Sequence, residues 1–138
     1  ESADAQQSLR DGTAALQEGK VVIIYPEGTI TRDPQTWPMH ARTGVARLAL
    51  TADVPVVPMV HWGTHRVLDG YNKKFRPLPR GPITVRCGEP VDLSAYRGRP
   101  IDAGLLREVT DLLMVRVRDL LAEVRGEPAP ATFFRRAS

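Results

Sequence analysis

The chain has 138 residues, of which 42% are hydrophobic and only 6% aromatic, so one compact domain with a mainly aliphatic core is expected. Its formal net charge of +3 favours anionic ligands or an anionic membrane surface, but it is too small to indicate a nucleic-acid-binding protein. The single cysteine excludes an internal disulfide, and no apolar run approaches the roughly eighteen residues that a membrane-spanning helix needs.

The first part of the chain predicts a helix followed by a strand. Residues 4–18 combine an apolar face with a polar outer face, and Gly19 is typical of a helix end. Residues 21–25 form a continuous apolar run rich in β-branched side chains, which predicts a buried strand. Pro26 ends this strand because proline cannot donate a ladder hydrogen bond.

A turn with functional side chains follows the expected strand. It contains a carboxylate, a glycine and a hydroxyl, in the order Glu27, Gly28 and Thr29. In open α/β sheets, ligands bind beyond the carboxyl ends of strands, and the backbone N–H groups of a turn can face an anion. The same residues also suit an ordinary surface turn, and their spacing alone favours neither interpretation.

Residues 30–40 lack periodicity and predict a loop that Arg32 and Arg42 bracket. Two guanidinium groups can chelate one phosphate, although each arginine taken singly is more often a solvated charge. Trp37 and Met39 are expected to pack this loop onto the domain, with the lining of an acyl-chain channel as the alternative. A second helix is expected over residues 41–52, and its N-terminus would strengthen an anion site that it faced.

The second half of the chain predicts two strands and a long helix. Residues 55–62 form a buried strand whose two prolines restrict its pairing, and residues 83–89 alternate as a half-buried strand in which Cys87 is expected to be a buried, inert thiol. Asp102 caps a helix that extends to about Arg125 with a stripe of leucine and valine on one face. Alternating helices and three to four strands indicate an α/β domain.

Two other stretches have a weaker functional signal. His61 and His65 have the spacing of zinc ligands on a helix, but Trp-Gly between them argues against a helix, so no metal site is expected. Residues 67–80 are polar and basic with two aromatic residues, which suits anionic headgroups or a CoA-type donor and equally suits a solvated loop.

The expected turn resembles a known sequence block. The stretch Tyr25-Pro26-Glu27-Gly28-Thr29 is similar to the (F/Y)PEGT block of the glycerolipid acyltransferases, whose best-known members are lysophosphatidate acyltransferases. Downstream, Arg42-x-Gly44 and the stretch 46–59, which ends in Val-Pro-Val-Val-Pro-Met, resemble the KxG…VPVVPV block of the same family. The two blocks stand in the family's order and with its gap, and the segment at 88–90 also resembles one of its elements.

The resemblance implies a glycerolphosphate acyltransferase-like α/β domain with a central mixed sheet covered by helices. Residues 1–126 would be the C-terminal part of this single domain, and residues 127–138 a flexible tail containing prolines. The remainder of the domain is expected to precede Glu1. The intact enzyme would be associated with the cytoplasmic face of the membrane, peripherally or through an N-terminal anchor.

The same resemblance implies a binding site for 1-acyl-glycerol-3-phosphate. The turn would hold the glycerol portion, two arginines the phosphate, and two prolines would shape the site, which gives the set Glu27, Gly28, Thr29, Arg32, Arg42, Pro55 and Pro58. The family often has an arginine directly after the threonine, where this chain has Ile30. Arg32 is the expected substitute for that missing charge.

The family's catalytic pair, a histidine and an aspartate spaced H-x4-D, is absent from this chain. In that pair the aspartate orients the histidine, which takes the proton of the attacking hydroxyl. The residues five positions after the three histidines are not acidic; they are Val45, Arg66 and Gly70. No catalytic residue is therefore assigned here, and the chain alone is expected to be almost inactive.

The resulting hypothesis is the acceptor-binding part of an O-acyltransferase of phospholipid biosynthesis. The enzyme would transfer an acyl group from acyl-CoA or acyl carrier protein to lysophosphatidate, without a cofactor or metal, and give phosphatidate. Acylation of another lysolipid or of a glycolipid is the first alternative, and the departure from the family pattern at Ile30 keeps it open. A non-catalytic lipid- or phosphate-binding module is the second, whereas a purely structural α/β domain explains neither sequence block.

Overall fold

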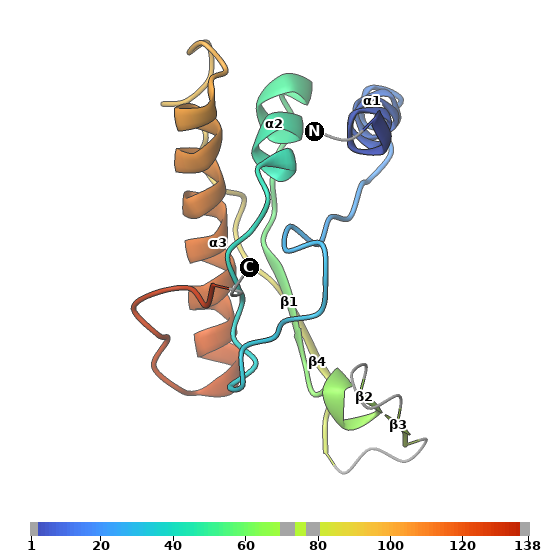
Figure 1. Ribbon diagram of the computed structural model, residues 1–138, viewed down its shortest axis with the longest axis vertical. Coiled ribbons are helices and arrows are strands. Elements are labelled where there is room, and N and C mark those ends of the chain that lie inside the picture. Colours follow the sequence, from blue (N-terminus) through green and yellow to red (C-terminus); the bar gives the residue numbers. More distant parts are fainter. Residues whose placement is uncertain (1–2, 70–73, 77–80, 136–138) are drawn as a thin grey trace.

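The computed structural model describes residues 3–69, 74–76 and 81–135. The chain forms helices and short strands (Figure 1), in the order α1 Ala3–Gln17, α2 Gly44–Ala52, β1 Met59–Trp62, the 3₁₀ helix η1 Thr64–Arg66, β2 Leu68–Asp69, β3 Lys74–Phe75, β4 Thr84–Cys87 and α3 Ala103–Arg125. The predicted α/β class is confirmed. No helix in the described ranges is both long enough and apolar enough to cross a bilayer. Most of the basic loop at 67–80 lies outside those ranges.

Helix α3 is the largest element, and its ends follow the predicted capping residues. Asp102 accepts a hydrogen bond from the N–H of Leu105 (2.7 Å), and Gly126 ends the helix with a φ of +66°. The apolar stripe of α3 is buried and contributes Leu105, Val109, Leu113 and Leu120 to the core. Figure 1 shows α2 between α3 and α1, with the β1–β4 pair lying along α3.

Strands β1 and β4 are antiparallel, with Met59 opposite Cys87 and Trp62 opposite Thr84. Two backbone hydrogen bonds extend the pairing beyond the ladder, from Gly88 N to Pro58 O and from Val91 N to Val56 O, both 2.8 Å. The strand expected at 55–62 is therefore present in its second half. Its first half pairs irregularly because Pro58 offers only its carbonyl oxygen.

One face of this strand pair is covered by α3 and the other is exposed. Val60 is buried toward α3, whereas Val85 on the opposite face is 62% exposed. The expectation that Cys87 is a buried thiol is wrong, and all four residues of β4 are exposed. The physical reason is the register: Val85 and Cys87 lie on the face away from α3, while Arg86 on the near face pairs with Glu123 of α3 (2.9 Å).

The strand expected at 21–25 is not formed, and this is the main correction to the sequence analysis. The segment belongs to no ladder among the described residues, and Val21 and Ile23 are 88% and 65% exposed. Its contact with β1 is a ring contact between Tyr25 and His61, with centroids 6.3 Å apart. An apolar strand gains stability from a hydrogen-bonded neighbour and from layers over its faces, and the described residues supply neither.

The pairing in the described residues also differs from a central mixed sheet. Both strand pairs, β1–β4 and β2–β3, are antiparallel. Parallel pairing occurs as an isolated bridge between Met39 and Phe134, where His40 N donates to Phe134 O (3.0 Å). The residues after α3 thus return to the 30–40 loop. The domain boundary at 126 and the flexibility of residues 127–138 stay predictions.

Candidate functional site

The turn at residues 25–28 has the compact geometry that its sequence predicts. The N–H of Gly28 donates to Tyr25 O (3.0 Å), with Pro26 at the second position, where its fixed φ suits a turn. Gly28 has a φ of +67°, in the left-handed region that glycine adopts without steric cost. The absence of a side chain at Gly28 leaves room for another side chain to pack against this turn.

Arg42 lies directly over this turn, although the whole 30–40 loop separates them in sequence. Its backbone N–H donates to Pro26 O (2.9 Å). Its side chain crosses Gly28 so closely that a Cβ atom at Gly28 would lie 3.5 Å from Nε of Arg42. The backbone of Arg42 is thus held at the turn, and its exposed side chain is accessible from solvent.

The carboxylate of Glu27 connects the turn to the far end of the loop. Its Oε2 atom accepts a hydrogen bond from the backbone N–H of Met39 (2.8 Å). Burial raises the pKa of Glu27 above its ordinary value of 4.5, and the hydrogen bond from Met39 offsets part of this increase. Because Met39 binds Oε2, the other carboxylate oxygen, Oε1, is the atom that a ligand hydroxyl would contact.

The raised pKa of Glu27 predicts a specific pH dependence. Between 4.5 and its folded-state pKa, the native state binds more protons than the unfolded state, so stability falls as pH rises through this window. Glu27→Gln keeps an oxygen acceptor for Met39 and removes the titration. The free energy of unfolding of Glu27→Gln minus that of wild type is therefore expected to be larger at about pH 7 than at about pH 4. Urea unfolding at both pH values measures this, and a pH-independent difference would contradict it.

The remaining predicted site residues are not assembled around the turn by any contact among the described residues. Thr29 and Arg32 are exposed, and Arg32 contacts the loop through its backbone N–H, which lies 3.0 Å from Sδ of Met39. Pro58 is buried beside Gly88 at the start of β1, whereas Pro55 is exposed. The structure therefore brings together Glu27, Gly28 and Arg42.

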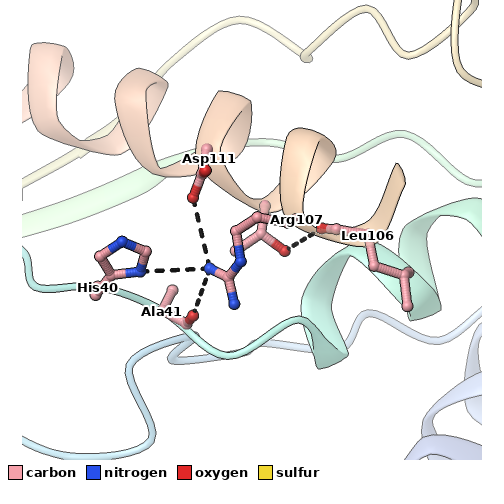
Figure 2. A network of polar contacts seen from close by, with 6 residues as sticks. His40, Ala41, Leu106, Arg107 and Asp111 are labelled. Carbon is pink, nitrogen blue, oxygen red and sulfur yellow. Dashed lines mark hydrogen bonds and ion pairs between the residues drawn. The ribbon is translucent and has the colours of Figure 1, made fainter. Parts of the chain in front are cut away.

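Two arginines of α3 support this region, and sequence reasoning gave neither of them a role. Arg107 donates from Nη1 to the carbonyl oxygen of Ala41 (3.0 Å), and the same atom lies 3.4 Å from His40 and 3.5 Å from Asp111 (Figure 2). Arg125 lies between the rings of Trp37 and Trp62. The spacing of the two arginines is close to a whole number of helical turns, so they share one face of α3. This periodicity is the sequence signal that could have identified them as contacts of the loop.

The histidines contact partners other than carboxylates. Nδ1 of His40 faces Arg107, which can only donate, so this nitrogen is the acceptor. Nδ1 of His61 lies 2.9 Å from the hydroxyl of Thr64, and His65 stacks on Trp62 at 4.7 Å. Within the described ranges, no three His, Cys, Asp or Glu side chains are grouped as metal ligands.

Comparison with known proteins identifies the sequence pattern that contains this turn. Residues 1–62, which include α1, the turn, Arg42, α2 and β1, match the family model described as Acyltransferase. No solved structure matches this chain significantly.

Three similar relatives carry the name 1-acyl-sn-glycerol-3-phosphate acyltransferase. The protein from Limnanthes douglasii is 33% identical over 101 residues, or 72% of this chain and 34% of the relative. The protein from Limnanthes alba is 32% identical over the same shares, and that from Cocos nucifera is 33% identical over 71% of this chain and 30% of its own length. The chain belongs to the acyltransferase family. It matches about a third of the length of each relative.

Proposed function

We propose that the chain is the acceptor-binding part of a 1-acylglycerol-3-phosphate O-acyltransferase. The complete enzyme transfers a fatty acyl group from acyl-CoA or acyl carrier protein to 1-acyl-glycerol-3-phosphate and forms phosphatidate. The observation that carries this proposal is the position of the Arg42 side chain over Gly28, the residue that follows Glu27 in the turn. These residues lie in the region that matches the family, and the names of the relatives support the acceptor.

The chemistry of the three residues suits a glycerol phosphate. Oε1 of Glu27, the oxygen that Met39 does not bind, accepts a hydrogen bond from a glycerol hydroxyl, and a charged acceptor makes this bond stronger than a neutral one. Arg42 offers a planar fork of donors to the phosphate oxygens. The lack of a side chain at Gly28 lets Arg42 lie against the turn that carries Glu27. Acyl transfer also needs a base for the attacking hydroxyl, so this chain by itself binds the acceptor without transferring an acyl group.

Further parts of the proposal concern the complete enzyme. Thr29, Arg32, Pro55 and Pro58 contribute to the acceptor site once the domain is complete. The apolar run at 21–25, which forms no strand among the described residues, pairs into the central sheet only in the complete enzyme, and this accounts for its exposed apolar side chains. The enzyme works at the cytoplasmic face of the membrane, because its acceptor and product are lipids.

The test is an NMR titration of the isotope-labelled chain with sn-glycerol 3-phosphate. We expect chemical-shift changes at Gly28 and Arg42, and Arg42→Gln is expected to weaken binding by about tenfold or more, because a charge-assisted phosphate contact is lost. Arg10→Gln is the matched control, since Arg10 is an exposed arginine of α1 outside the turn. Absence of shifts in the turn, or equal weakening by Arg10→Gln, would contradict the proposal.

A second acceptor class is favoured by Ile30, which is 56% exposed where the family often has arginine. A neutral glycolipid headgroup would need fewer charges at this position. Titration with glycerol and with glycerol 3-phosphate separates the two classes: equal affinity favours a neutral acceptor, and tighter binding of the phosphate favours lysophosphatidate. Peptide mass mapping of the natural protein then tests for catalysis, because an H-x4-D sequence before Glu1 would exclude a purely binding module.

A further inference from the structure

Residues 31–41, called the 31–41 loop from here on because the segment includes Ala41, connect the Glu27 turn to Arg42. Helix α3 holds this loop at two separate positions. The first is Arg125, whose guanidinium lies 4.1 Å from the ring centroid of Trp37 and 4.4 Å from that of Trp62. The Arg125 side chain is only 8% exposed, and its Nη1 donates to the carbonyl oxygen of Gln35 (2.8 Å). A desolvated guanidinium between two indoles is a strong cation–π contact, so it fixes the middle of the loop.

Arg107 holds the end of the same loop. Its Nη1 donates to Ala41 O (3.0 Å), and Ala41 immediately precedes Arg42 (Figure 2). Asp111, one turn further along α3, lies 3.5 Å from the same nitrogen and helps to orient the guanidinium. The backbone position from which the Arg42 side chain starts is therefore tied to α3.

Hydrogen bonds of the loop backbone connect the residues that contact α3 with the candidate site. Trp37, the residue stacked on Arg125, accepts a hydrogen bond from Thr31 at its carbonyl oxygen (2.6 Å). Two residues after Trp37, the N–H of Met39 donates to Glu27. The loop also contains Thr36 with a φ of +61°, a conformation that a β-branched residue keeps only where its surroundings enforce it.

We propose that Arg107 and Arg125 are positioning residues for acceptor binding. They hold the 31–41 loop on α3, and the loop in turn holds the Glu27 carboxylate, through Met39, and the backbone of Arg42, through Ala41, at the turn that contains Gly28. This inference rests on the proposed function for the identity of the ligand. Its structural part, the dependence of the Met39–Glu27 hydrogen bond on α3, stands on the contacts alone.

The experiment uses the full 138-residue chain and the variants Arg107→Gln, Arg125→Gln and Arg116→Gln. Arg116 is the matched control, an exposed arginine on the same helix. Amide hydrogen exchange at Met39 is the first readout, and we expect at least about tenfold faster exchange in the two loop-contacting variants. Affinity for sn-glycerol 3-phosphate is the second, with an expected loss of about tenfold, because small displacements of binding groups have large effects. Arg107→Lys, which keeps a donor for Ala41, is expected to restore most of the affinity.

Tryptophan fluorescence gives a third readout, because Trp37 and Trp62 are the chain's two tryptophans and both contact Arg125. Emission is expected to change in Arg125→Gln and to stay constant in Arg116→Gln. Unchanged Met39 exchange in both variants would overturn the inference whatever the ligand does. The inference is also overturned if Arg107→Gln and Arg125→Gln both bind sn-glycerol 3-phosphate as tightly as the wild-type chain does. If the wild-type chain itself does not bind sn-glycerol 3-phosphate, the proposed function is contradicted, and Met39 exchange alone decides the inference.

Discussion

Replacing Gly63 with alanine is expected to lower the free energy of unfolding by about 3 kcal/mol, from left-handed strain together with a backbone overlap. Gly63 is buried between β1 and η1 with a φ of +98°. A Cβ atom there would overlap the carbonyl oxygen of Pro82 and lie 3.3 Å from Cα of Ile83. Both neighbours belong to the backbone that enters β4, so relief of the clash requires a shift of the strand pair.

Gly98 provides the control for this substitution. It also has a positive φ, +76°, but a Cβ atom there would meet nothing within 4 Å. Gly98→Ala therefore isolates the backbone strain and is expected to cost about 1 kcal/mol. Urea denaturation followed by circular dichroism measures both variants. If Gly63→Ala costs no more than Gly98→Ala, the close approach of the Pro82 backbone to Gly63 is wrong.

Trp37→Ala is expected to have the other large effect, a loss of about 3–5 kcal/mol of stability, as for other large buried aromatic side chains. Trp37 is 3% exposed and lies in a cluster with Val60, Leu120 and Leu121. The substitution opens a cavity between the 31–41 loop and α3, and it removes one of the two rings that cover the Arg125 guanidinium.

Two further variants provide reference values for the loss of stability expected in Trp37→Ala. Trp37→Phe keeps an aromatic ring over Arg125 and is expected to cost about half as much as Trp37→Ala. Phe75→Ala removes an aromatic side chain that is 69% exposed, so a change within about 0.5 kcal/mol is expected. Chemical denaturation compares the three. A cost of Trp37→Ala similar to that of Phe75→Ala would show that the loop does not pack on α3.

Local chemistry made several elements predictable. The aspartate and glycine at the ends of α3 have capping roles that depend on neighbouring backbone groups, and both perform them in the structure. The turn at 25–28 depends on a proline and a glycine within four residues, and it too forms as expected. The packing of Trp37 and Met39 into the core was also predicted and is confirmed.

The contacts between distant segments were not predictable in the same way. The run at 21–25 has strand propensity, but a strand also needs a hydrogen-bonded neighbour, which the described residues do not supply. Cys87 was assigned to the wrong environment because an alternating pattern does not state which face of β4 meets α3. The two arginines on α3 look like solvated helix charges until the loop folds against them.

The sequence by itself determined the α/β class, the ends of α3, the Glu27–Gly28 turn and the acyltransferase family, because each depends on residues that are close along the chain. Only the tertiary structure decided that Arg42 lies over Gly28, that Glu27 binds the N–H of Met39, and that Arg107 and Arg125 hold the loop between them. These contacts join segments far apart in sequence, and their geometry follows from how the loop and α3 pack on a shared core.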